Sequence, residues 1–205
     1  MSNNSSTGGY LAPALPAPLY DNEFEDFLHD VIVGVSGFAN EDVRPRWQIE
    51  PANQPDFPDN WIAFGIMRMA GDTYGVIQHD PADGGGEGGD SQIRYETVDV
   101  LLSAYGRGAA GALALIRDGF QIEQNRAAMN LANVSYQYAG DIIPAPSLVK
   151  ERWLRRYDMT INLRRAIQRT YPVLTLTASK VHLVVENPGG TRIVDEEIDI
   201  TETAP

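Results

Sequence analysis

A glycine-rich stretch between residues 106 and 111 is the first candidate for chemistry. Gly106, Gly108 and Gly111 match G-x-G-x-x-G, in which glycine lets a dinucleotide pyrophosphate approach a helix N-terminus. However, Arg107 stands where small residues normally admit the pyrophosphate, and no second strand ending in an acid follows about twenty residues later. We therefore favour the alternative that these small residues allow a helix to pack closely on a sheet.

Acidic residues between positions 80 and 91 are candidates for binding a hard cation through oxygen. They are Asp80, Asp83, Glu87 and Asp90, but their spacing does not follow the calcium-loop pattern, and the glycines between them cost entropy to order. The three histidines lie far apart without H-E-x-x-H spacing, and the absence of cysteine excludes thiol nucleophiles and cysteine-ligated zinc. We expect a protein that is not an enzyme and has no catalytic residue, metal ligand or cofactor.

The most informative charge pattern is a basic stretch over residues 150–169. It holds seven basic and two acidic residues in a chain whose net charge is −12. The basic residues are Lys150, Arg152, Arg155, Arg156, Arg164, Arg165 and Arg169, and the acids are Glu151 and Asp158. Surfaces of opposite sign let copies of one chain pair head to tail, and such a contact closes into a ring when the rotation permits. Pairing with acidic strands of the same chain is the alternative, and both can hold.

The hydrophobic pattern predicts an α+β fold in which two or three helices pack on a mostly antiparallel sheet of long strands. Apolar residues at three- and four-residue spacing over 24–32 predict a helix, with Asn22 and Glu25 as its capping box. Strands are expected over 61–69, 74–79, 92–105, 134–143, 151–169, 173–186 and 191–200, and further helices over 106–120 and 123–131. The strands over 61–69 and 74–79 are expected to form a hairpin through Gly71 and Asp72.

Prolines at positions 13, 16 and 18 predict a flexible or extended N-terminal arm over residues 1–20, followed by a single domain over 21–205. No run of 18 apolar residues predicts a membrane span, and the N-terminus lacks the pattern of a signal peptide. The negative net charge argues against a protein that coats DNA.

Several sequence blocks, in order along residues 21–175, resemble one known family. They are Arg44-Pro45 with Trp47, Trp61-Ile62-Ala63-Phe64-Gly65-Ile66, Tyr105-Gly106, Leu115 to Ile122 with Gln124-Asn125-Arg126, Arg152-Trp153 with Arg155 to Asp158, and Arg164-Arg165 with Arg169 to Val173. They resemble the bacteriophage neck terminator family, the tail-terminator or tail-completion proteins of tailed phages. One departure is the glycine-rich insert at 83–89, which is longer than the family pattern.

The resemblance implies a structural virion protein without a cofactor. It implies a homohexameric ring at the head-proximal end of the tail tube, which stops tube polymerisation, joins the tail to the neck and leaves a channel for DNA. The implied partners are further copies, the tail tube protein, a neck, head-completion or connector protein, and the tail sheath. DNA passes without sequence-specific binding, no membrane is involved, and the virion neck is assembled in the host cytoplasm. The alternatives are another neck component, such as a head-completion or adaptor protein, and a nucleotide-binding enzyme that uses Gly106–Gly111.

The residues expected to support this role fall into two groups. Aromatic residues expected to build the core or its rim are Trp61, Phe64, Tyr105 and Trp153. Residues expected at the subunit interface or in structural ion pairs are Arg44, Arg117, Asp118, Arg152, Arg155, Arg156, Asp158, Arg164 and Arg165. The net charge of −12 further suggests an acidic channel lining, which would repel passing DNA.

Overall fold

A computed structural model describes residues 3–14, 17–48, 60–149, 151–176, 178–186 and 192–201. The side chains of residues 149 and 152 and of both terminal strands lie outside this description. The chain forms two compact units: a larger one of Leu15–Ile77 and Gln92–Arg169, and a smaller one of Met1–Ala14, Gln78–Ser91 and Thr170–Pro205. The division into an arm over residues 1–20 and one domain over 21–205 stays a prediction.

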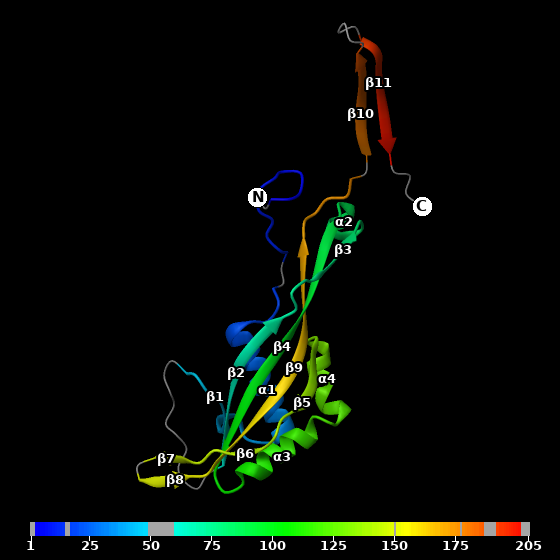
Figure 1. Ribbon diagram of the computed structural model, residues 1–205. Coiled ribbons are helices and arrows are strands. Elements are labelled where there is room, and N and C mark those ends of the chain that lie inside the picture. The colour runs from blue at the N-terminus through cyan, green and yellow to red at the C-terminus, as the bar shows by residue number, and fades with distance from the viewer. Residues whose placement is uncertain are drawn as a thin grey trace. The chain divides into compact units, whose positions relative to one another are not determined.

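The expected α+β class is confirmed, with a mixed and mostly antiparallel seven-stranded sheet in the order β1-β2-β4-β9-β5 (Figure 1). In addition, β3 pairs with β4, and β6 pairs with β9. The strands are β1 (Val43–Pro45), β2 (Trp61–Gly71), β3 (Val76–Asp80), β4 (Gly89–Tyr105), β5 (Val134–Ala139), β6 (Ile143–Pro144) and β9 (Arg156–Tyr171). The short strand β1 runs parallel to β2, whereas β2 runs antiparallel to β4, and β5 and β6 run antiparallel to β9.

The expected hairpin between β2 and β3 is wrong, because both strands pair with β4. Strand β4 has 17 residues, so it is long enough to carry two partners one after the other. After β2 ends at Gly71, the backbone N–H of Asp72 donates to the carbonyl oxygen of Tyr95 at 2.9 Å. That bond keeps the chain on β4 instead of letting it fold back on β2.

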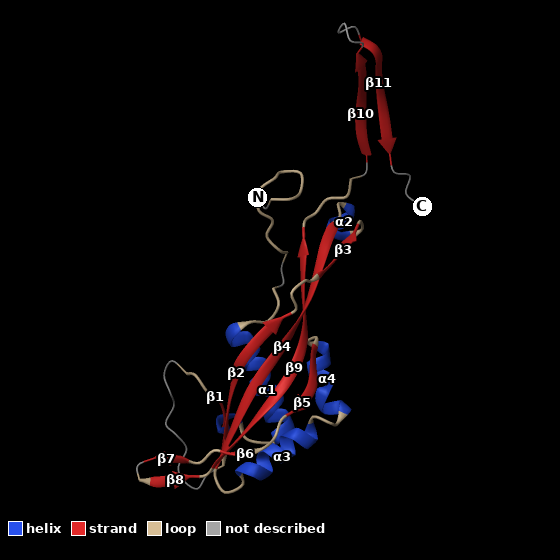
Figure 2. Cartoon of the chain, in the orientation of Figure 1, coloured by secondary structure: helices blue, strands red, loops and turns tan. Residues whose placement is uncertain are grey.

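Three helices pack on one face of the sheet of the larger unit: α1 (Asp21–Ser36), α3 (Ala109–Gly119) and α4 (Glu123–Leu131) (Figure 2). The other helical segments are the four-residue α2 (Asp83–Gly86) and a 3-10 turn, η1 (Asn40–Asp42). Helix α1 ends at Gly37, whose φ of 69° is left-handed and whose N–H donates to the carbonyl of Val33. Within the described part of the chain, none of the helices has the length and hydropathy needed to cross a lipid bilayer.

The expected capping box of α1 is wrong, because Asn22 does not occupy the N-cap position. The residue before the helix is Tyr20, which has an extended backbone and makes no side-chain cap, and Asn22 already lies inside the first turn. The Tyr20 side chain is used elsewhere, since its hydroxyl donates to Glu96 at 2.9 Å. The residue before this helix therefore uses its side chain in a tertiary hydrogen bond and not in a cap.

The core of the larger unit lies between these helices and the sheet. The helices contribute Phe24, Leu28, Ile32, Leu113, Ile116 and Met129, and the sheet contributes Ile62, Phe64, Val98, Val100, Leu102, Met159, Ile161 and Leu163, all at most 3% exposed. The alternation predicted along β9 holds, because every second residue from Met159 to Ile167 is buried. The sheet is therefore apolar on the face that the helices cover, and polar residues of β9 occupy the opposite face.

The long strand expected over 151–169 begins later, because a separate hairpin precedes it. Strand β7 (Ser147–Val149) pairs antiparallel with β8 (Arg152–Leu154), and the turn between them places Glu151 at a φ of 63°. The chain then leaves strand geometry at Arg155 before β9 begins. Period-two alternation runs through this break, so the sequence pattern does not reveal it.

The last two strands, β10 (Ala178–Glu186) and β11 (Arg192–Thr201), form a two-stranded antiparallel sheet in the smaller unit. The register pairs Val181 with Ile198, Leu183 with Glu196 and Val185 with Val194. At the intervening positions it pairs Lys180 with Asp199 and His182 with Glu197.

We expect Leu113→Ala to lower the free energy of unfolding by about 3 kcal/mol, because the side chain is fully buried in the core. Leu115→Ala, two residues along the same helix, is the matched control, since Leu115 is 53% exposed. Its effect should stay within about 0.5 kcal/mol. Urea denaturation of both variants measures the difference, and equal losses would contradict the assigned helix face.

Candidate interaction surfaces

A buried arginine connects β9 to three other parts of the larger unit. The Arg165 side chain is 3% exposed, and its guanidinium donates to Glu96 at 2.9 and 3.1 Å and to the carbonyl of Leu19 at 2.7 Å. The same guanidinium lies over the rings of Phe24, at 4.2 Å, and Tyr20, at 4.4 Å. Carboxylate, carbonyl and ring faces together offset the cost of removing the charge from water. Arg165, expected in an interface or structural pair, thus forms an ion pair inside the chain.

On the opposite face of β9, polar pairs cross between strands. Arg164 donates to Asp72 at 2.7 Å and lies over the ring of Tyr95 at 5.2 Å. Asn162 donates to Asp99 at 2.6 Å, and Arg68 approaches the same carboxylate at 3.7 Å. Most charges on this sheet face are therefore neutralised within the chain.

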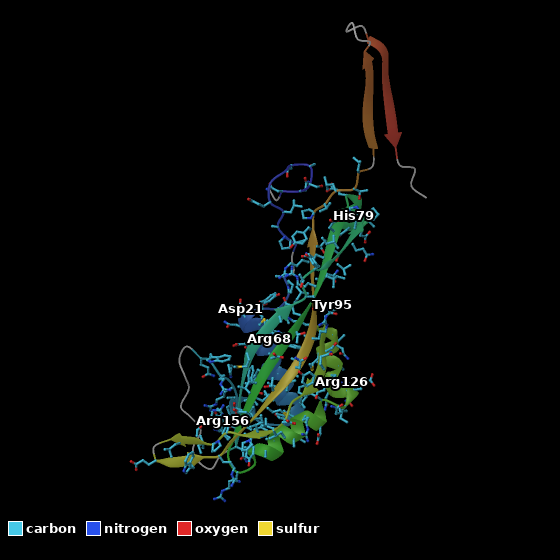
Figure 3. The ribbon with its side chains drawn as sticks, in the orientation of Figure 1. Asp21, Arg68, His79, Tyr95, Arg126 and Arg156 are labelled. Atoms are coloured by element: carbon cyan, nitrogen blue, oxygen red, sulfur yellow. The ribbon has the colours of Figure 1, made fainter. Side chains whose placement is uncertain are left out.

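Arg156 and Asp158 form the best-aligned pair of that face. The guanidinium donates through Nε at 2.8 Å and through Nη2 at 2.6 Å, and both side chains are 21% exposed. The hydrogen bond to Asp158 raises the pKa of Arg156 above its usual value, against the opposing effect of burial. Figure 3 shows Arg156 at the end of the sheet beside β7 and β8, away from Arg68 and Tyr95.

The expected aromatic residues divide between core and surface. Phe64 is fully buried, and Trp61 at the start of β2 stacks on Tyr105 at the end of β4, with ring centroids 4.0 Å apart. The guanidinium of Arg156 lies 5.9 Å from the centroid of the Tyr105 ring. Trp153 does not join them, because it lies in the β7–β8 hairpin and is 69% exposed. Trp153 is therefore not buried in the core of the single chain, and its expected place at the rim of the core stays a prediction.

The remaining expected residues, where the structure describes their side chains, lie outside the buried core. Arg117 and Asp118 are neighbours on α3 with their closest atoms 3.4 Å apart, and Arg44 donates to the carbonyl of Glu41 at 2.6 Å. Arg155 is exposed between β8 and β9. Arg152 lies in β8, but its side chain, like the whole of Lys150, is outside the described residues. Their role at a subunit interface stays a prediction.

The glycine-rich stretch at 106–111 lacks the setting of a dinucleotide site. The preceding strand, β4, pairs antiparallel with β2, whereas the dinucleotide fold needs a parallel sheet. The backbone N–H of Gly108, which a phosphate would need, donates to the side chain of Asn60 at 2.9 Å. Ala109 and Ala112 are buried against the core, which agrees with a packing role for the small residues.

The acidic stretch at 80–91 is organised by a contact that the sequence did not reveal. His79 bonds through Nδ1 to Asp90 at 2.8 Å and through Nε2 to Thr175 at 2.9 Å. Among the described residues, no three histidine, aspartate or glutamate side chains gather closely enough to hold a metal. Since Thr175 is 96 residues from His79 along the chain, no local pattern signals the link.

We expect Arg165→Met to lower the free energy of unfolding by about 3–5 kcal/mol, because it leaves Glu96, only 12% exposed, without its cationic partner. Arg164→Met is the matched control on the neighbouring residue, where the pair with Asp72 is partly exposed. The control should lose at most about 1 kcal/mol. Thermal and urea unfolding measure both, and a small loss for Arg165→Met would show that the buried pair adds little.

Comparison with other proteins gives one informative result. No curated protein matches the chain. A family model described as phage neck terminator protein matches residues 22–187, which is most of the chain and includes the whole of β9. Proteins of that description are structural components of the virion neck, where they meet other neck and tail proteins. The resemblance seen in the sequence blocks is thereby confirmed, and the chain belongs to the phage neck terminator protein family.

Proposed function

We propose that the protein forms a homohexameric ring at the head-proximal end of the tail tube. There it ends tube polymerisation, joins the tail to the neck and leaves a channel for the genome. The observation that carries this proposal is the family match over residues 22–187. The partners would be further copies, the tail tube protein, a head-completion or connector protein on the other side, and the sheath where a tail has one.

Uneven charge supports assembly from identical copies. The smaller unit contains ten aspartate and glutamate residues but only two basic ones, Lys180 and Arg192. Two exposed arginines of the larger unit, Arg107 and Arg155, form no ion pair within the described part of the chain. A molecule with separate acidic and basic surfaces is suited to heterologous contacts, and these generate rings.

Pairing within the chain supports passage of DNA without binding. Arg156, Arg164 and Arg165 each engage a carboxylate of the same chain, so three of the seven bases of the basic stretch are not free to bind phosphate. With a net charge of −12, an acidic channel lining is the corresponding proposal. A channel lined mainly by arginine would contradict it.

The ring is tested by native mass spectrometry and electron microscopy of the purified protein, alone and with tail tube protein. The expected species is a ring of six chains of 22.5 kDa each. Particles that contain a different copy number, or place the protein away from the tube end, would favour another neck component.

We expect Arg156→Glu to impair ring formation, because it replaces the pair with Asp158 by two neighbouring carboxylates beside the β7–β8 hairpin. The matched control is Arg68→Glu on the same sheet face, where the arginine is 66% exposed and its ion pair is looser. The control should assemble normally. An unchanged hexamer mass for Arg156→Glu would remove this residue from the interface.

A further inference from the structure

The β7–β8 hairpin of the larger unit presents an apolar pair that the chain itself leaves uncovered. The register places Leu148 opposite Trp153, and the two residues are 62% and 69% exposed. Each strand of this hairpin has only three residues, so the hairpin adds little to the core. Tryptophan is the residue type most enriched among the energetic centres of protein interfaces. The pair therefore has the chemistry of an anchor that enters a pocket on a partner.

The smaller unit contains a pocket of about 340 Å³ that fits such an anchor. One wall is the N-terminal arm at Ala12–Ala14, the other is the glycine-rich loop at 83–89, and the segment from Thr170 to Leu174 completes the lining. Pro13, Pro172 and Leu174 give the pocket apolar surface, and Asp83 and Glu87 belong to its lining on the loop side.

Hydrogen bonds hold the three walls together, so the pocket exists before any partner arrives. Ala14 donates its N–H to Thr170 at 2.7 Å, and Leu174 donates its N–H to the Ser5 hydroxyl at 2.8 Å. On the loop side, Thr175 donates its N–H to the carbonyl of Glu87 at 2.8 Å.

Gly88 is a position of the loop at which the backbone geometry requires glycine. Its φ is +102°, and a Cβ there would lie 2.7 Å from the backbone nitrogen of Thr175. The hydrogen bonds of His79 to Asp90 and Thr175 also hold this loop against the segment that follows β9. The glycine-rich insert is thus a built part of the pocket.

We propose that the hairpin carrying Trp153 in one copy of the chain docks in this pocket of the next copy. Charge favours a second copy as the occupant: the loop segment 78–91 has four acids and no lysine or arginine, whereas Arg155 beside the hairpin is exposed. The hairpin and the pocket are different surfaces of the chain, so the contact between two copies is heterologous and propagates around a ring. The inference rests on the proposed ring and specifies which surfaces close it.

The first test is Trp153→Ala in the full chain, with Tyr138→Ala as the control, since Tyr138 is an aromatic residue with 60% exposure on β5. Loss of a buried interfacial tryptophan should weaken association roughly thirtyfold. Native mass spectrometry should show smaller species for Trp153→Ala and intact rings for the control, with equal melting temperatures. Intact rings for both variants would overturn the proposal.

A charge reversal tests the rim of the pocket. Arg155→Glu and Glu87→Arg should each reduce ring yield, and the double variant should recover it, because the opposite charges are restored across the contact. A double variant no better than the worse single variant would overturn the pairing of these two residues.

Cross-linking tests proximity directly, because the chain has no cysteine of its own. Glu151→Cys, at the turn of the hairpin, and Ala12→Cys, at the pocket, are prepared separately, mixed and treated with a short bismaleimide. A cross-linked pair of chains is expected, and Leu115→Cys on α3 mixed with Ala12→Cys should give none. Cross-linked open chains without closed rings would support the contact while refuting the proposed ring. If the protein forms rings but the cross-link does not form, the contact between hairpin and pocket is refuted and the ring is not. If Trp153→Ala keeps intact rings but no longer binds the tail tube protein, the hairpin belongs to the contact with the tube.

Discussion

The guanidinium of Arg165 is the interaction on which the arrangement of the larger unit depends. It joins β9 to β4 through Glu96, holds the chain before α1 through the carbonyl of Leu19, and supports two aromatic rings at the start of that helix. A charge at 3% exposure is stable only while each of these partners stays in place. The register between β9 and β4 and the start of α1 are therefore set together.

The arginines of β9 serve different purposes because the two faces of the sheet differ. The buried face allows one arginine with a complete set of partners, while the opposite face holds Arg164 and Arg156 in partly exposed pairs. Arg155, where the chain leaves strand geometry, remains exposed. A strongly acidic member of a structural phage family thus uses three of the seven bases of its basic stretch in ion pairs within its own sheet.

Regular patterns in the sequence predicted regular parts of the fold. Alternation predicted the buried face of β9 from Met159 to Ile167, and α4 has the predicted bounds of Glu123–Leu131. The sequence blocks also indicated the family. Errors arose where a distant residue decides the local structure: Tyr20 bonds to Glu96 instead of capping α1, and β3 continues along β4 because β4 is long. The exposure of Trp153 could not be predicted, because hydrophobicity alone does not distinguish a buried aromatic residue from an exposed one, and the pocket walls come from segments far apart in the sequence.

The ribbon formed by β10 and β11 has a consequence for the unassembled chain. Within the described residues neither of its outer edges has a partner strand, and such edges are templates for uncontrolled addition of other strands. Strand β11 carries Asp195, Glu196, Glu197 and Asp199, so two ribbons brought edge to edge would place like charges side by side. Charges of like sign on a strand with a free edge oppose such edge-to-edge addition, which is how gatekeeper residues limit aggregation.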